Sequence, residues 1–113
     1  MHKIGYFYII SNNHSTVLYC GATDDLCRRI LEHKNNIYNN SFSGRYNLTK
    51  LVYFESYSLL TDAFGREKQI KAGSRKKKIE LIESVNPEWK DLFDSLKNHK
   101  GEELIILKNF FKK

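Results

Sequence analysis

The sequence predicts an α/β domain of the α+β type, in which three strands combine with amphipathic helices. Two segments near the N-terminus, residues 3–10 and 16–22, are rich in aromatic and β-branched residues, and a cluster of turn residues separates them. This pattern predicts an antiparallel hairpin, and residues 49–55 repeat the strand pattern further along the chain. At 113 residues, the sequence has the length of one domain.

The first helix is expected directly after the second strand. Thr23 or Asp24 would cap its N-terminus, because a side-chain oxygen there accepts hydrogen bonds from free backbone N–H groups. Arg29 and His33 are four residues apart, so they lie one above the other at the border of the apolar stripe. The stripe itself is expected to consist of Leu26, Cys27, Ile30 and Leu31.

Two further helices are expected at residues 58–71 and 75–85, and a short one at residues 88–93 with Trp89 as its anchor. Glu67 falls on the apolar stripe of the first of these helices. A carboxylate that faces inward is unfavourable unless a cation or a hydrogen-bond donor receives it, so Glu67 needs a partner. The apolar members of that stripe are Leu60, Ala63, Phe64 and Ile70.

The remaining segments show little periodicity. Residues 35–47 are polar and indicate a mobile loop. Residues 102–113 are loosely amphipathic and would form a helix or a final strand. We therefore expect residues 1–95 to form the domain, and residues 96–113 to form a C-terminal extension that packs on it or serves in association.

Charge and cysteine content restrict the cellular context. The net charge of +6 suggests an anionic partner such as nucleic acid, although a basic surface that serves solubility alone is the alternative. Cys20 and Cys27 form no CxxC pair, so they indicate reduced thiols rather than a zinc framework. Without a secretory h-region or a membrane-spanning apolar run, we expect a soluble, cytoplasmic protein.

Two tripeptides and the spacing after them resemble the GIY-YIG nuclease family. Residues 6–8, Tyr-Phe-Tyr, stand where the family has Gly-Ile-Tyr, and residues 19–21, Tyr-Cys-Gly, where it has Tyr-Ile-Gly. The spacing from Gly21 to Arg29 and His33 also matches. The resemblance is strongest to the small standalone bacterial members, which are of the UPF0213 type and are often described as similar to excinuclease C. It extends over residues 4–93, with further matches at residues 66–71, 74–78, 81–82 and 86–92.

The sequence departs from the family pattern in both tripeptides and directly after the second. Tyr6 replaces the first Gly of the motif, with Gly5 one step early, and Cys20 replaces Ile in the second tripeptide. Ala22 stands where some relatives have Lys. The loss of that Lys removes one possible interaction with phosphate or water, and therefore bears on catalytic rate more than on the class of reaction.

The resemblance implies a small three-stranded antiparallel sheet flanked by helices, with metal-dependent hydrolysis of phosphodiester bonds. Glu67 would ligate a single Mg²⁺ or Mn²⁺, a hard cation that takes one or two carboxylates and keeps water and substrate oxygens as other ligands. Arg29 would hold the scissile phosphate. Tyr8, helped by His33, would deprotonate or orient the attacking water. The catalytic candidates are Tyr8, Tyr19, Arg29, His33, Glu67 and Asn86.

Each candidate has an ordinary structural interpretation when it is taken alone. The two tyrosines would be amphipathic strand residues, and the Arg-His pair would be the solvated edge of a helix. Glu67 would be half of a structural ion pair. Its partner would then be Arg66, Lys71 or Arg29. Together, and with the family spacing, the residues favour a catalytic site.

A run of four cations at residues 75–78 opens the third helix, where positive charge opposes the helix dipole. Phosphate binding would compensate for this, and a solvated basic face is the alternative. The sequence shows no base-reading element, which indicates low sequence specificity. The expected nucleic-acid contacts are Arg45, Lys68, Lys71, Arg75, Lys76, Lys77 and Lys78.

These observations predict an endonuclease that cuts DNA, including structured or damaged DNA, in repair or processing. One alternative is a catalytically weak or inactive nucleic-acid-binding module of the same fold. Another is an adaptor that joins a repair complex through its C-terminal segment. The sequence leaves open the physiological substrate, the choice between DNA and RNA, nicking or double-strand cleavage, the metal, and the oligomeric state.

Overall fold

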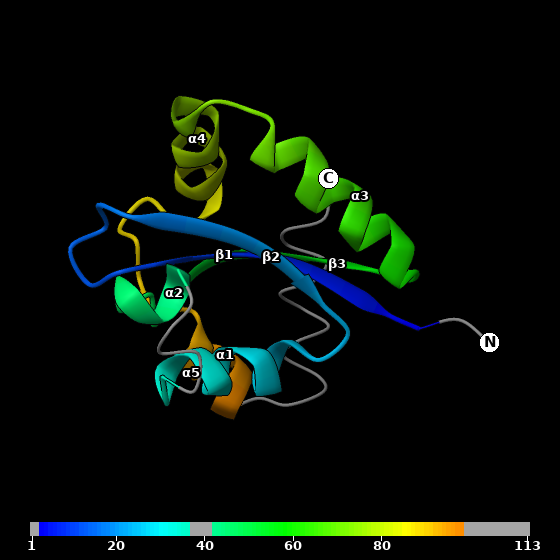
Figure 1. Ribbon diagram of the computed structural model, residues 1–113, viewed down its shortest axis with the longest axis horizontal. Helices are drawn as coiled ribbons and strands as arrows, with labels where there is room; N and C mark the ends of the chain where they lie inside the picture. Colours follow the sequence, from blue (N-terminus) through cyan, green and yellow to red (C-terminus); the bar gives the residue numbers. More distant parts are fainter. Residues whose placement is uncertain (1–2, 37–41, 99–113) are drawn as a thin grey trace.

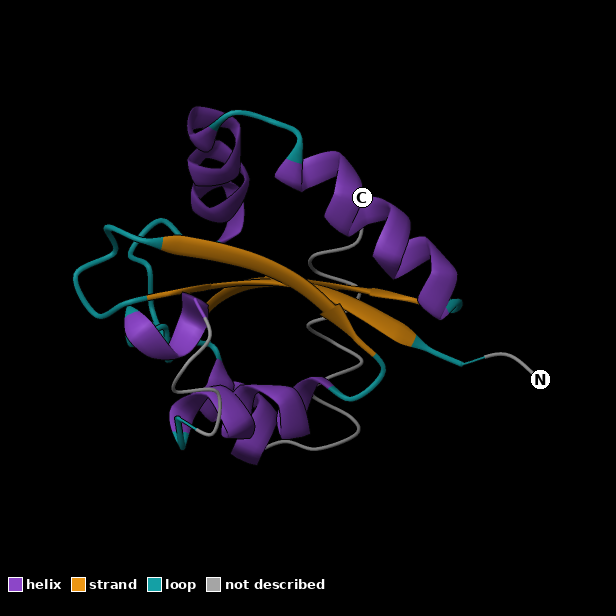
Figure 2. Cartoon of the chain, viewed as in Figure 1, coloured by secondary structure: helices purple, strands orange, loops and turns teal. Residues whose placement is uncertain are grey.

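A three-stranded antiparallel sheet forms the middle layer of the molecule (Figures 1 and 2). The computed structural model describes residues 3–36 and 42–98. The strands are β1 (Gly5–Ser11), β2 (Leu18–Thr23) and β3 (Lys50–Tyr57), and they pair in the order β2-β1-β3. The predicted hairpin, the third strand and the fold class are confirmed.

Helices cover both faces of this sheet (Figure 1). On one side lie α1 (Leu26–Lys34), the single turn α2 (Phe42–Arg45) and α5 (Phe93–Asn98). On the other side lie α3 (Leu60–Lys71) and α4 (Arg75–Val85), which confirm the two longer helices expected there. In the described part of the chain, no helix has the length and apolar character needed to cross a membrane.

The central strand β1 places its side chains alternately against the two helical layers. Tyr8 faces α1, where it contacts His33. Phe7 points to the opposite face, and its neighbour across the sheet, Glu55, reaches Arg66 of α3. Because both faces are covered, most of β1 is buried, as its continuous apolar sequence predicts.

The first helix differs in detail from the prediction. Its N-cap is Asp25, whose carboxylate accepts a hydrogen bond from a backbone N–H of the first turn. Thr23 is instead the last residue of β2, so the expected cap at Thr23 or Asp24 was wrong by one or two positions. Leu31 is 46% exposed, whereas His33 is 7% exposed. The helix is therefore rotated so that His33, rather than Leu31, faces the sheet.

Three other expectations were wrong. Part of the expected loop at residues 35–47 is the helical turn α2, whereas residues 37–41 lie outside the described ranges. Phe64 is 45% exposed instead of buried on α3. The short helix begins at Phe93 rather than at residue 88, because the Asp91 carboxylate accepts hydrogen bonds from the backbone N–H groups of Leu51 and Phe93 and holds the preceding segment as an irregular turn. Most of the proposed extension, residues 99–113, also lies outside the described ranges.

The carboxylate of Glu55 is buried and extensively hydrogen-bonded on the α3 side of the sheet. Arg66 donates to both of its oxygens, with N···O distances of 2.9 Å. The hydroxyls of Tyr53 and Tyr57, two positions away along β3, also donate to it. Burial raises the pKa of Glu55, but these hydrogen bonds outweigh burial and hold the pKa below its usual value. Arg66 therefore fastens α3 to β3 through a buried ion pair.

We expect Glu55→Ala to lower the free energy of unfolding by about 3 kcal/mol or more, because the substitution leaves the Arg66 charge partly buried without its partner. Urea unfolding followed by circular dichroism measures this change. Glu80→Ala, at an exposed position on α4, is the matched control and should change stability by less than about 0.5 kcal/mol. Similar midpoints for the two variants would contradict the assigned role of Glu55.

Candidate active site

Tyr8 lies directly across from Gly21 in the β1–β2 pair. A Cβ atom at Gly21 would overlap the hydroxyl and Cζ of Tyr8, so the ring lies over the backbone of β2 at a position that only glycine leaves open. The Tyr8 side chain is almost fully buried as a result. The glycine of the second tripeptide thus determines where the tyrosine of the first one points.

The hydroxyl of Tyr8 lies 3.3 Å from Nε2 of His33. On the other side of the imidazole, Nδ1 lies 3.1 Å from Oγ of Ser43, which α2 supplies. When Nδ1 carries the proton and donates it to Ser43, Nε2 accepts the hydrogen bond from Tyr8. The ring of Tyr19 packs beside His33, with ring centroids 6.3 Å apart. Strands and helices from four parts of the chain therefore meet at one imidazole.

Burial and Arg29 set the protonation states of this pair. Burial lowers the pKa of His33 to about 4, and the positive charge of Arg29 acts in the same direction. Burial also raises the pKa of Tyr8, whereas the charge and hydrogen bond of Arg29 oppose that rise. At neutral pH the site therefore holds a neutral imidazole beside a protonated phenol, and Arg29 favours the transfer of charge onto the tyrosine oxygen.

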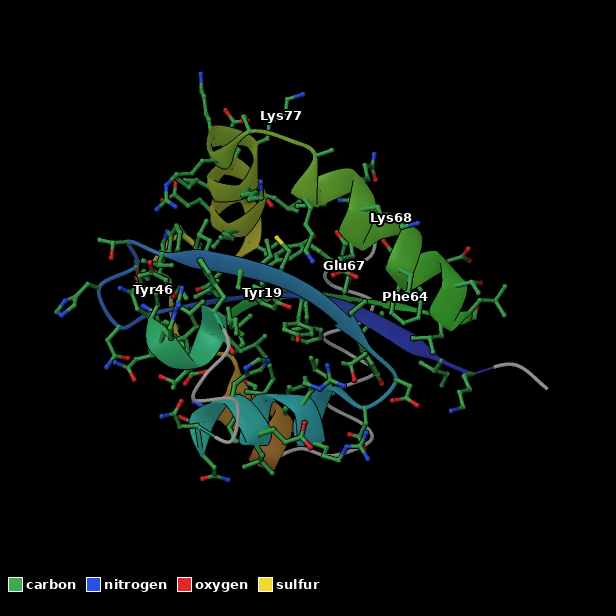
Figure 3. The ribbon with its side chains drawn as sticks, in the orientation of Figure 1. Tyr19, Tyr46, Phe64, Glu67, Lys68 and Lys77 are labelled. Carbon is green, nitrogen blue, oxygen red and sulfur yellow. The ribbon has the colours of Figure 1, made fainter. Side chains whose placement is uncertain are left out.

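Glu67 reaches the same region from α3 on the other side of the sheet (Figure 3). Its side chain is 19% exposed, and Lys71 Nζ lies 2.6 Å from its Oε2. Lys71 also lies over the ring of Tyr19, with Nζ 5.3 Å from the centroid. The negative charge of Glu67 contributes to the raised pKa values of Tyr8 and Cys20, so it acts on both faces of the sheet. The structure thus brings Glu67 to the edge strand β2.

The donor set suits a cation that needs few protein ligands. Within residues 3–36 and 42–98, no group of three or more His, Cys, Asp or Glu side chains could hold a metal ion. Glu67 provides one carboxylate, which Lys71 connects to the Tyr19 ring and whose charge acts on Tyr8. Mg²⁺ sites built on one or two carboxylates complete their shell with water and phosphate oxygens. Glu67 therefore fits such an ion, in competition with Lys71.

Asn86 is placed differently from the other candidates. Its amide nitrogen donates to the backbone carbonyls of Val52 and Lys90, and its amide oxygen accepts from the Lys90 N–H. It is buried and links β3 to the turn after α4. These contacts explain the residue structurally, and its part in catalysis stays a prediction.

The expected nucleic-acid contacts lie on three helices, and several are engaged within the protein. Arg75 donates to the carbonyl of Thr16, and Lys78 donates to the carbonyl of Gly73 just beyond α3. These contacts explain two of the four cations at the start of α4. Lys68 and Lys77 project from α3 and α4 away from the sheet (Figure 3). The exposed members of the set are Arg45, Lys68, Lys71, Arg75, Lys76 and Lys77.

Comparison with known proteins agrees with this geometry. The model of the GIY-YIG catalytic domain matches residues 4–80, so the chain belongs to the GIY-YIG family. It is 36% identical over 83 residues to a UPF0213 protein of Syntrophus aciditrophicus, covering 74% of this chain and 93% of that protein. It is 37% identical over 81 residues to a UPF0213 protein of Clostridium perfringens, covering 72% and 85%. No solved structure matches the chain significantly.

The lowered pKa of His33 predicts a loss of stability in mild acid. The folded protein resists protonation of His33 until the pH approaches about 4, whereas an unfolded chain takes up this proton near pH ~6.5. The free energy of unfolding should therefore fall as the pH drops through this window, by up to ~1.4 kcal/mol per pH unit for one proton. Urea titrations of wild type and His33→Gln measure the change.

His33→Gln should show a shallower fall than wild type over that window, because glutamine does not titrate. The control is His14→Gln, which alters an exposed histidine in the turn between β1 and β2. It should keep the wild-type pH dependence. Equal slopes for wild type and His33→Gln would show that His33 does not carry the effect.

Proposed function

We propose that this protein is a metal-dependent endonuclease that hydrolyses phosphodiester bonds in DNA with low sequence specificity. The observation that carries the proposal is the hydrogen bond of 3.3 Å between the Tyr8 hydroxyl and Nε2 of His33, a base that is neutral at physiological pH. Structural needs alone do not explain a buried phenol paired with an imidazole beside Arg29. Membership of the GIY-YIG catalytic domain family supports the class of reaction.

In the proposed mechanism, a water molecule attacks the phosphorus, and the P–O bond to one sugar oxygen breaks. The proton of the attacking water passes to the Tyr8 oxygen while the Tyr8 proton moves to Nε2 of His33, and the leaving sugar oxygen takes a proton from solvent. Ser43 holds the imidazole in the required tautomer. Arg29 binds the scissile phosphate, and a bound phosphate offsets the Arg29 charge that otherwise depresses the pKa of His33. His33 would then be a stronger base when substrate is present than in the free protein. Tyr19 hydrogen-bonds phosphate or water at the outer side of the site.

Glu67 is the proposed ligand of the divalent ion, Mg²⁺ or Mn²⁺. When bound, such an ion supplies Lewis-acid stabilisation of the phosphate and lowers the pKa of water. Lys71, now paired with Glu67 at 2.6 Å, would release the carboxylate to the ion and contact substrate phosphate instead. Lys71 thus supplies a cation beside the Tyr19 ring of β2.

A catalytically inactive binding module is the second candidate, and one observation favours it. The ion pair with Lys71 gives Glu67 a partner without any metal, as the structural interpretation of Glu67 requires. In that case the basic surface alone would account for nucleic-acid binding. The two candidates differ in whether Glu67 has a chemical role.

We expect supercoiled plasmid and branched DNA to be nicked in Mg²⁺ or Mn²⁺ and to stay intact in EDTA, because the phosphate needs the ion's charge. Glu67→Gln removes the proposed ligand at nearly constant volume and should reduce the rate by at least about 100-fold. Gel electrophoresis of the products measures the rate. Glu80→Gln, which alters an exposed carboxylate on α4, is the matched control and should cut as wild type does.

The outcomes of this assay separate the two candidates. Nicking that depends on metal and disappears in Glu67→Gln supports the nuclease and its ligand together. Equal residual nicking by wild type and Glu67→Gln indicates a contaminating nuclease. If neither protein cuts while both bind DNA, the binding module replaces the proposed function.

The basic run predicts a change in salt dependence. We expect Lys76→Gln/Lys77→Gln to weaken DNA binding and to flatten the slope of log affinity against log salt by ~0.9 for each phosphate that is no longer neutralised. Fluorescence anisotropy at several salt concentrations measures this slope. Arg28→Gln/Lys90→Gln removes two exposed charges elsewhere and should keep the wild-type slope. An unchanged slope in Lys76→Gln/Lys77→Gln would show that these lysines do not contact DNA phosphates and only form a solvated basic face.

A further inference from the structure

Two large aromatic rings are exposed beside the candidate site. Phe42 and Tyr46 are each 45% exposed, and their ring centroids lie 4.8 Å apart at an angle of 47°. Phe42 also stacks on Tyr19, with centroids 6.2 Å apart and planes inclined by 29°. Because Tyr19 packs beside His33, a continuous row of rings leads from the buried imidazole to the surface.

This row ends at the surface rather than in the core. A single exposed apolar side chain is common in soluble proteins and needs no explanation. Here the exposed rings touch each other and continue into the site, and the exposed Arg45 lies between them in the sequence. Rings next to cations form the usual surface for nucleic-acid bases and their phosphates.

We propose that Phe42 and Tyr46 form a stacking platform for an unpaired base next to the scissile phosphate, so that the preferred substrate is single-stranded at the cleavage point. This proposal rests on the proposed nuclease function. A base in a duplex already has both faces covered by its neighbours, whereas an unpaired base gains from stacking on an aromatic side chain. Arg45 and Lys71 supply the positive charge for the flanking phosphates.

The arrangement across the site supports a strand that runs over the edge of the sheet. In Figure 3, Tyr46, which follows α2, lies to one side of Tyr19. Phe64 on α3, also 45% exposed, lies to the other side, beyond Glu67. A single strand that follows this line would meet exposed rings both before and after the proposed metal ligand.

Binding of short single-stranded and duplex DNA of the same sequence tests the platform. Fluorescence anisotropy measures both affinities. EDTA and the Glu67→Gln background prevent cleavage, so the DNA stays intact during the measurement. Tyr46→Leu keeps an apolar side chain but removes the ring face, and should weaken single-strand binding by about fivefold or more. Duplex binding should change by less than about twofold. Tyr46→Phe keeps the ring and should bind single strands as the parent protein does.

The control is Leu31→Ala, which alters a similarly exposed apolar residue on α1 and should leave both affinities unchanged. Equal loss of single-strand and duplex binding in Tyr46→Leu, or no loss, would overturn the proposal. If Tyr46→Leu elutes as a smaller particle than the parent protein in size-exclusion chromatography and binds DNA unchanged, the rings serve self-association and the proposal is overturned.

A parallel cleavage assay in Mg²⁺, with Glu67 intact, separates this proposal from the nuclease function. Single-strand binding that depends on the Tyr46 ring, in a protein that never cleaves, supports the platform and contradicts the nuclease. Cleavage of single strands at the wild-type rate by Tyr46→Leu, with unchanged affinity, contradicts the platform and supports the nuclease.

Discussion

The close approach of Tyr8 to Gly21 is the constraint on which the candidate site depends. A side chain at Gly21 would occupy the space of the Tyr8 hydroxyl, so the phenol could no longer lie over β2. That position brings the hydroxyl within reach of His33, and the burial that results keeps the imidazole neutral. The two tripeptides are therefore one structural unit, and their pairing in the sheet is what creates the proposed base.

At the edge strand β2, Lys71 takes part in two interactions at once. Its Nζ contacts the Glu67 carboxylate and lies over the Tyr19 ring. In the proposed mechanism, this ion pair competes with the divalent ion for Glu67, so metal affinity would be modest without substrate and would increase when a phosphate draws Lys71 away.

Much of the fold could be predicted because its signals are local. The apolar strands, the two longer helices and the spacing of Arg29 and His33 follow from nearby residues. Ser43 and Glu55 are not among the residues predicted from the sequence, because their partners come from other parts of the chain and meet them only in the folded structure. Ser43 lies in a polar segment without periodicity, and only the fold brings it to His33. Glu55 shares a strand face with two tyrosines, a signal present in the sequence, but its partner Arg66 becomes evident only when α3 is placed on the sheet.

The central claim is that Tyr8 and His33 act as one proton-transfer unit. The most direct test is single-turnover cleavage of plasmid DNA by wild type, Tyr8→Phe, His33→Gln and the double variant. If the two residues act through one another, the double variant should be no slower than the slower single variant. Rate losses that multiply in the double variant, or cleavage at the wild-type rate by either single variant, would contradict the account.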